Sequence, residues 1–199
     1  QSPNIISFAK SYNIGQTYYD WREMLEKESP DAIIVAVSWN QTEEIIEDVI
    51  KSGIPCLIEK PVALSSKKLI EIISATEKLN QEVLVGYNRR FYDFIPQLKS
   101  VIESEELLSI ALNFPEAVDS IIKAYSTDVV DHILIYMSSH WLDLLMYLIG
   151  DVRIDYMHRG NTADNISRAY NGMLYSLKYN VPIHLQANFN TPSQISMIF

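Results

Sequence analysis

The sequence predicts an α/β chain in two parts: a parallel, doubly wound sheet, followed by an α/β domain with an open, mostly antiparallel sheet. Near-continuous apolar runs, typical of strands buried on both faces, alternate with amphipathic helices through the first part. The connections between them are short, as in right-handed parallel βαβ units with helices on both faces. In the second part apolar and polar residues alternate, which is typical of strands with one face in water.

The first part, residues 1–90, is predicted as one domain. Glycine ends the helix that precedes the second strand, at Gly53. Helical spacing covers residues 2–14, 20–28, 41–53 and 65–80, and the apolar strands cover 31–38, 55–60 and 82–88.

The second part, residues 91–199, is predicted as a second domain that is incomplete at its carboxyl end. A helix over 89–104 bridges the two domains, and a strand at 107–114 precedes an irregular stretch, 115–130. An apolar helix at 133–149 precedes strands at 151–157 and 183–189. In the first of these strands Val152, Ile154 and Tyr156 are expected on one face, opposite Arg153 and Asp155.

Composition excludes some partners. The net charge is −9 and the lysines and arginines are scattered, which argues against nucleic acid and anionic membranes as partners. Cys56 is the only cysteine, so no internal disulfide is possible, and a reducing, cytoplasmic location is expected. No signal peptide is visible, and the apolar helix contains too many polar residues for a membrane span.

Polar residues follow each parallel strand, at the edge where open α/β sheets bind ligands. They are Ser38, Trp39 and Asn40 after the first strand, Glu59 and Lys60 after the second, and the segment 87–90 after the third. Pro61 cannot donate to the strand ladder, and it biases Lys60 toward an extended conformation. Lys60 is thereby presented at the edge as a candidate acid or base. Alternatively, it is a strand-end lysine that turns to solvent.

The helix at 133–149 carries a second group of polar residues. On an α-helix Tyr136 and His140 share a face, as do His140 and Asp143. Histidine titrates near neutrality and suits proton transfer. The alternative is a hydrogen-bonded histidine in the core.

Three motifs, in this order, resemble the Gfo/Idh/MocA family of NAD(P)-dependent oxidoreductases. They are I-E-K-P-V-A-L-S at 58–65, V-L-V-G-Y-N-R-R-F at 83–91 and S-S-H-W-L-D-L-L-M-Y-L-I-G-D-V at 138–152. The resemblance implies a Rossmann-like domain, NAD or NADP as cofactor, and a sugar, sugar nucleotide or cyclitol as substrate. It also implies a homo-oligomer, either a dimer or a tetramer.

The resemblance also implies roles for single residues. Lys60 matches a lysine near the nicotinamide and the reacting hydroxyl, and His140 matches the histidine that takes or gives the hydroxyl proton. Glu59 matches a residue of the cofactor pocket, and Asn88 and Arg89 match residues facing nicotinamide and substrate. Asp143 matches a residue that supports the histidine or contacts the sugar. Lys60, Asn88, Tyr136 and His140 are therefore expected to converge on one cleft between the two domains.

The sequence departs from the family pattern at several positions. Tyr136 stands where the family has an aspartate, and Ser138 where it has a glycine. Tyr136 either substitutes as a proton donor or marks a member without activity. The run Val37-Ser38-Trp39-Asn40 stands where the family often has T-P-N-H. Ser38, Trp39 and Asn40 are expected to contact the cofactor, and Trp39 either stacks on a ring or only packs. No G-x-G-x-x-G turn occurs, so the chain is expected to be the middle of a longer protein.

The leading hypothesis is an oxidoreductase that transfers hydride between nicotinamide and a hydroxyl or keto group of a sugar, sugar derivative or cyclitol. The alternative from another class is a catalytically silent carbohydrate-binding or assembly subunit on the same scaffold. A third hypothesis is a nicotinamide reductase for another substrate, such as a bile pigment or a dihydrodiol.

Overall fold

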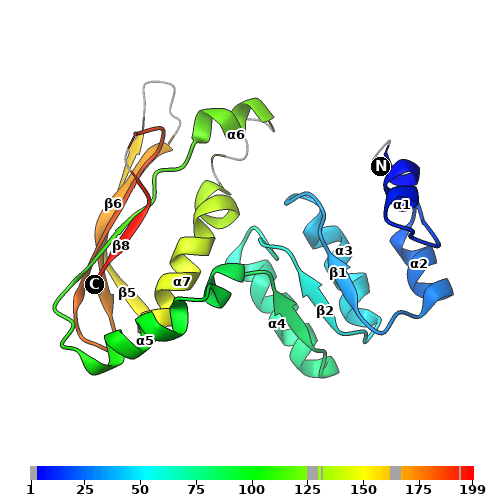
Figure 1. The fold of residues 1–199 in the computed structure, drawn as a ribbon, viewed down its shortest axis with the longest axis horizontal. Helices are drawn as coiled ribbons and strands as arrows, with labels where there is room; N and C mark the ends of the chain where they lie inside the picture. Colours follow the sequence, from blue (N-terminus) through cyan, green and yellow to red (C-terminus); the bar gives the residue numbers. More distant parts are fainter. Residues whose placement is uncertain (1–3, 125–129, 131, 162–166, 193) are drawn as a thin grey trace. The chain divides into compact units, whose positions relative to one another are not determined.

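The computed structural model describes residues 4–124, 130, 132–161, 167–192 and 194–199. The chain forms two compact units, Gln1–Val85 and Gly86–Phe199 (Figure 1). The division therefore falls before the boundary that the sequence suggested near residue 90. The reason is that the segment after the third strand packs onto a helix of the second unit, as described below.

The first unit contains a three-stranded parallel sheet, as predicted, in the order β1-β2-β3. Its strands are shorter than the apolar runs that predicted them, because only three residues of each enter the ladder. The elements in chain order are α1 (Ile5–Ser11), α2 (Trp21–Glu28), β1 (Ile33–Val35), α3 (Thr42–Lys51), β2 (Cys56–Ile58), α4 (Ser66–Leu79) and β3 (Val83–Val85).

One face of this sheet forms the core of the unit. Ile33, Val35 and Ile58 are buried against residues of α3 and α4, with Leu25 of α2 at the margin. The other face carries a row of apolar residues in register, one from each strand. Ile34 is 72% exposed, Leu57 40% and Leu84 61%. Helices covering this second face, which the sequence predicted, are not found among the described residues.

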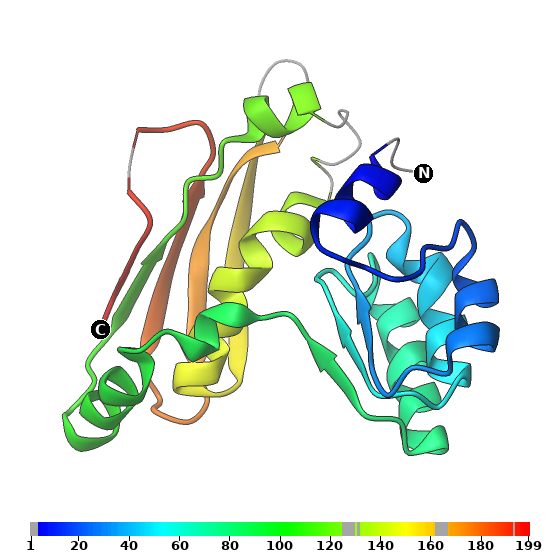
Figure 2. The same cartoon turned by 45° about the vertical axis from the view of Figure 1, so that its right-hand side comes forward.

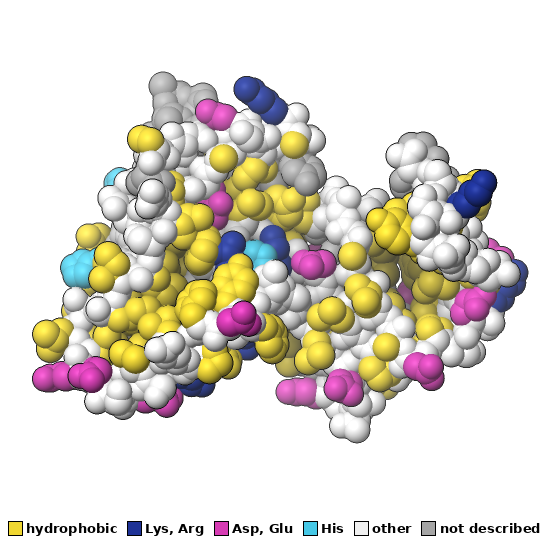
Figure 3. All heavy atoms as spheres, viewed as in Figure 1, with side chains coloured by type: hydrophobic (Ala, Val, Ile, Leu, Met, Phe, Trp, Pro, Cys, Tyr) yellow, Lys and Arg dark blue, Asp and Glu magenta, His cyan; other side chains and the backbone are white. Residues whose placement is uncertain are grey.

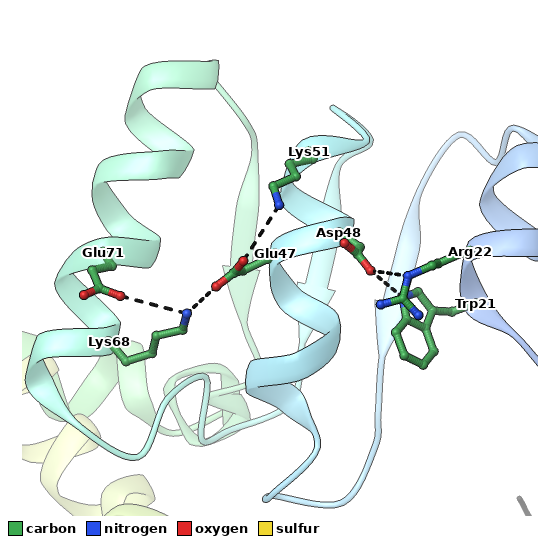
Figure 4. A network of polar contacts seen from close by, with 7 residues as sticks. All are labelled: Trp21, Arg22, Glu47, Asp48, Lys51, Lys68 and Glu71. Atoms are coloured by element: carbon green, nitrogen blue, oxygen red, sulfur yellow. Dashed lines mark hydrogen bonds and ion pairs between the residues drawn. The ribbon is translucent and has the colours of Figure 1, made fainter.

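Polar contacts join the three larger helices of the first unit on their outer side (Figure 4). The Asp48 carboxylate on α3 accepts a hydrogen bond from the Trp21 indole at 3.1 Å and pairs with Arg22 at 2.9 Å. Glu47, one residue earlier, pairs with Lys68 of α4. Surface ion pairs of this kind contribute little, so the buried core supplies most of the stability.

The second unit contains a five-stranded mixed sheet in the order β5-β6-β7-β4-β8. Of the strand pairs in the described part of this unit, β4 with β7 is the one parallel pair, so the prediction of a mostly antiparallel sheet is confirmed. The elements are η1 (Asn88–Phe91), α5 (Ile95–Ser104), β4 (Ile110–Asn113), α6 (Val118–Ala124), η3 (Leu134–Ser138), α7 (Ser139–Ile149), β5 (Val152–Asn161), β6 (Ser167–Ser176), β7 (Pro182–Asn188) and β8 (Ser196–Ile198).

Helix α7 packs on one face of the five-stranded sheet (Figure 2). The predicted alternation in β7 is confirmed, since Ile183, Leu185 and Ala187 are buried whereas His184 and Gln186 are exposed. Apolar side chains gather over β5 and α7 (Figure 3), and between helix and sheet lies an apolar cavity of about 210 Å³. Within the described residues no helix is long and apolar enough to cross a membrane.

A β-bulge in β5 overturns the expected placement of Tyr156. Ile154 lies opposite Leu174, but Tyr156 lies opposite Met173, because the register shifts between Ile154 and Tyr156. Directly opposed residues point to the same face, so Tyr156 points to the opposite face from Ile154. Alternation read from the sequence assumes an unbroken period of two, which the extra residue, Asp155, interrupts.

Three other predicted segments differ in the structure. The bridging helix begins only at Ile95, because Pro96 suits the first turn of a helix and not its interior; residues 88–91 form a separate 3₁₀ turn. The stretch predicted to be irregular contains α6, and residues 125–129 of it lie outside the described part. The apolar helix at 133–149 is divided into the π-helical η3 and the α-helical α7.

Candidate active site

In the first unit the predicted site residues lie at the carboxyl edge of the parallel sheet. Val35 and Ile58 are the last paired residues of β1 and β2, and the Glu59 amide extends the pairing by donating to the Val35 carbonyl at 2.8 Å. The polar residues that follow both strands, 38–40 and 59–60, therefore leave the sheet at the same edge. Open α/β sheets bind their ligands at this edge.

Lys60 is held between buried neighbours. Ile58 before it is fully buried and Val62 after it is 7% exposed, so the backbone on both sides is anchored in the core. The Lys60–Pro61 peptide bond is cis. Lys60 itself is half-buried, which differs from a strand-end lysine turned fully to solvent. A half-buried ammonium can bind a ligand oxygen while keeping its charge.

The residues after β1 form a tight turn into α3. The Gln41 amide donates to the Ser38 carbonyl at 2.8 Å, and α3 begins at Thr42. Ser38 and Asn40 are exposed, whereas Trp39 is half-buried. Both interpretations of Trp39, ring stacking and plain packing, agree with this degree of burial.

In the second unit the segment after β3 contacts α7 through an aromatic pair. The rings of Tyr87 and His140 meet edge to face, with centroids 5.9 Å apart and planes at 86°. Burial raises the pKa of the Tyr87 phenol, and the Asp143 carboxylate adds to this, while the nearby Ser139 hydroxyl and Arg90 oppose it. Tyr87 therefore stays neutral at physiological pH and offers the imidazole an uncharged neighbour.

Arg90 makes a two-point ion pair with Asp143. Its Nε donates to Asp143 Oδ2 at 2.8 Å, and its Nη2 donates to Asp143 Oδ1. The Asp143 side chain is only 10% exposed, and the pair raises the pKa of the Arg90 guanidinium. Both carboxylate oxygens of Asp143 thus accept from Arg90, which limits direct contact between Asp143 and a substrate.

Arg89 lies over the ring of Trp141, with its guanidinium carbon 3.3 Å from the ring centroid. Its Nη1 atom is buried and makes no hydrogen bond within the described part of the chain. Burial also lowers the pKa of Arg89. A buried donor of this kind is ordinarily satisfied by water or by a bound ligand.

Tyr136 lies in η3, where the helix is π-helical. The prediction that Tyr136 and His140 share a face used the α-helical spacing of four residues, and hydrogen bonds in a π-helix span five. That argument therefore does not apply to this turn. The spacing between His140 and Asp143 lies wholly within α7 and is unaffected.

Ser138, at the position where the family has a glycine, is fully buried at the end of η3. Its hydroxyl donates to Glu116 Oε1 at 3.1 Å, and Glu116 is only 8% exposed. The charge of Glu116 also raises the pKa of Arg89, opposing the effect of burial. Ser138 thus ties the start of the histidine helix to a buried acid beside the Arg89 guanidinium.

Replacing Ser138 with alanine should lower the free energy of unfolding by about 1–3 kcal/mol, since a buried carboxylate loses a hydrogen-bond donor. Chemical denaturation of the wild type and Ser138→Ala measures this difference. Ser104→Ala is a suitable control, because the Ser104 hydroxyl donates only to an exposed carbonyl. Equal stability of the two variants would contradict the structural role of Ser138.

The structure brings the predicted residues together in two groups, one in each unit. The prediction that Lys60 and His140 lie in one cleft stays a prediction, because they belong to different units. Sequence reasoning placed Tyr87 and Arg90 at the edge but gave them no role, and it missed Trp141 and Glu116. The G-Y-N-R-R-F motif could have indicated Tyr87 and Arg90, whereas no sequence pattern indicates Glu116.

The edge of the first unit carries an aromatic ring and several polar groups. It presents an indole ring at Trp39, an ammonium at Lys60 and exposed polar groups at Ser38, Asn40 and Glu59. Rings and polar side chains of this kind can contact a flat heterocycle and a ribose.

The parallel sheet, with polar residues following its strands at one edge, is typical of a Rossmann-like domain. Residues 1–87 match the Gfo/Idh/MocA family, described as an oxidoreductase family with an NAD-binding Rossmann fold. This match confirms the resemblance drawn from the motifs and the predicted fold class.

Individual relatives agree with this assignment. The chain is 27% identical over 180 residues to the uncharacterized oxidoreductase YrbE of Bacillus subtilis, covering 85% of this chain and 50% of the relative. It is 30% identical over 140 residues to an inositol 2-dehydrogenase of Klebsiella pneumoniae, covering 68% of this chain and 40% of that one. The chain thus spans half or less of the length of these relatives.

A solved structure extends the likeness of fold to both units. The WlbA dehydrogenase of Bordetella pertussis, solved in complex with NADH and UDP-GlcNAcA, matches with a TM-score of 0.82 at 18% identity. The match covers 97% of this chain and 58% of the WlbA chain. It shows that the three-stranded and five-stranded sheets follow the fold of this dehydrogenase.

Proposed function

We propose that the protein transfers hydride between NAD or NADP and a hydroxyl or keto group of a sugar, sugar derivative or cyclitol. The observation that carries the proposal is the setting of His140. It is half-buried on α7, contacts the neutral Tyr87 ring, and lies one turn from an aspartate already paired with Arg90. Histidine is the side chain that most often serves as general acid or base, and here it lies beside an uncharged phenol and on the same helix as a paired aspartate.

The relatives support the substrate class. One named relative is an inositol 2-dehydrogenase, and WlbA was solved with NADH and a nucleotide sugar acid. Both substrates carry several secondary hydroxyls, each of which can be oxidised to a ketone. The silent-subunit alternative is not favoured, because the relatives are oxidoreductases and dehydrogenases. The choice between NAD and NADP, and self-association through the open sheet face, stay predictions.

The proposed roles follow from charge and protonation. The nicotinamide, when bound, accepts or returns the hydride. His140 accepts the hydroxyl proton as the hydride leaves and returns it in reduction. The Lys60 ammonium stabilises the negative charge that develops on the substrate oxygen. Arg89 Nη1 donates to a second oxygen of the substrate, which satisfies this buried donor. Tyr136 is a second proton donor in this proposal, through its phenolic hydroxyl.

The test is an assay of the whole purified protein with a panel of substrates. Initial rates are followed by the absorbance of reduced nicotinamide, with NAD⁺ or NADP⁺ and with myo-inositol, simple aldoses or UDP-sugars. Saturable turnover with one of these polyols is expected. A protein that neither turns over any of them nor quenches its fluorescence on adding NADH or NADPH would contradict the proposal and support the silent subunit.

A further inference from the structure

We infer that Arg90 is a positioning residue that acts on His140 through Asp143. The inference rests on the proposed function for the name of the base, but its geometry stands within the second unit alone. Arg90 fixes the charge and orientation of Asp143, and thereby sets both the position of the His140 ring and the electrostatic field at it. Neither residue needs to touch the substrate for this role.

Contacts between the segment 87–90 and α7 occur in order along both elements. Tyr87 meets the first turn of α7 at His140, Arg89 meets the next residue, Trp141, and Arg90 meets Asp143. The Arg90 guanidinium carbon also lies 5.1 Å from the centre of the Tyr147 ring, one turn further on. The segment is therefore fixed to one side of α7 over successive turns, and His140 lies at the first of these contacts.

The Arg90–Asp143 pair is the strongest of these contacts. It consists of two charge-assisted hydrogen bonds, so it restrains both the distance and the orientation of the two side chains, whereas ring contacts restrain orientation weakly. Asp143 is also largely buried, and removing its partner would leave a carboxylate with little solvation. A lysine could replace the charge of Arg90 but not its planar fork.

The same pair sets the field at His140. Asp143 follows His140 by three residues on the α-helical α7, so the two side chains share a face. A carboxylate on the same helix face favours the imidazolium, and the Arg90 cation paired with it opposes that effect. Among the described residues, the charged or titratable groups around α7 include Tyr87, Arg89, Arg90, Lys99, Glu116, Asp143 and Tyr147.

The first experiment is an NMR titration of His140 in the chain as it stands, with the resonance assigned by its loss in His140→Gln. In Arg90→Met the uncompensated Asp143 should move the midpoint to higher pH. In Asp143→Asn the uncompensated Arg90 should move it to lower pH, and the double variant should return close to wild type. Opposite shifts are the signature of this role, since a merely structural defect would not reverse sign between the two partners.

The second experiment measures activity in the whole protein. Arg90→Met should lower kcat by about tenfold to a hundredfold with little change in KM, because the base is displaced while substrate contacts remain. Arg90→Lys should keep the wild-type titration midpoint but recover only part of kcat. Arg153→Met is the matched control, since it breaks an exposed Arg–Asp pair on β5 and should change neither readout.

The outcomes separate this inference from the proposed function. If His140→Gln abolishes turnover but Arg90→Met changes neither midpoint nor kcat, the inference about Arg90 is overturned and the proposed function survives. If the midpoints shift in opposite directions while His140→Gln stays fully active, the electrostatic coupling holds and the assignment of the base fails. Should Arg90→Met not fold, Arg90→Lys and Asp143→Asn decide the question alone.

Discussion

Replacing His140 with glutamine should lower kcat by about a hundredfold to ten-thousandfold, the usual contribution of general acid–base catalysis. Glutamine occupies a similar volume and keeps hydrogen-bonding atoms, but it cannot exchange a proton. The variant should lose the fall in rate on the acid side that protonation of a histidine base produces. Rates across pH, with KM measured at each pH, test this directly.

His184→Gln is the matched control for this substitution. His184 is exposed on the face of β7 opposite the buried residues, so its replacement should leave kcat unchanged. The competing interpretation of His140, a core histidine with a purely structural role, makes a different prediction. It requires His140→Gln to lower the melting temperature while kcat of the folded fraction stays at the wild-type value.

Local signals made the parallel part of the fold predictable from the sequence. Near the apolar runs that predicted β1, β2 and β3 lie a glycine and a proline, which end helices and strands for steric reasons. Gly53 follows α3 with a φ of 73°, a conformation that glycine adopts without strain, and Pro61 follows the last paired residue of β2 closely. Such boundaries lie within a few residues of the strand and need no information from elsewhere in the chain.

Features that depend on distant partners could not be predicted in the same way. Arg90 and Asp143 are 53 residues apart, and their pairing requires the segment after β3 to lie along α7. The family resemblance implied that Asp143 either contacts the substrate or supports the histidine. In the structure its carboxylate pairs with Arg90. Likewise nothing near Glu116 in the sequence indicates that it accepts a hydrogen bond from Ser138.

Irregular backbone also limited what sequence periodicity could predict. The π-helical turn at η3 and the bulge at Asp155 each add a residue to a regular repeat, and each reverses or voids an argument from periodicity. In the first case the α-helical spacing that aligned Tyr136 with His140 does not apply, and in the second Tyr156 lies on the other face. Period-based reasoning held for β7, whose register has no such irregularity.

Replacing Lys60 with methionine should lower kcat by about a hundredfold to a thousandfold, equivalent to about 3–4 kcal/mol of lost transition-state stabilisation. Methionine keeps the length of the side chain and its apolar packing but removes the charge that would stabilise the substrate oxygen. Because that negative charge develops fully only as the proton leaves, kcat should fall more than KM rises. Steady-state kinetics of the whole protein, with cofactor affinity measured by NADH fluorescence, provide both quantities.

Lys60→Met should have little effect on stability, and Lys51 provides a matched control. The flanking residues Ile58 and Val62 anchor the backbone, and Lys60 is only half-buried, so Lys60→Met should change the free energy of unfolding by less than about 1 kcal/mol. Lys51→Met removes an equivalent charge from the exposed end of α3 and should leave kcat unaltered. If Lys60→Met kept the wild-type kcat, Lys60 would have no part in catalysis. A collapsed melting temperature would instead assign the residue to the fold, because a half-exposed cation contributes that much only when it is a structural partner.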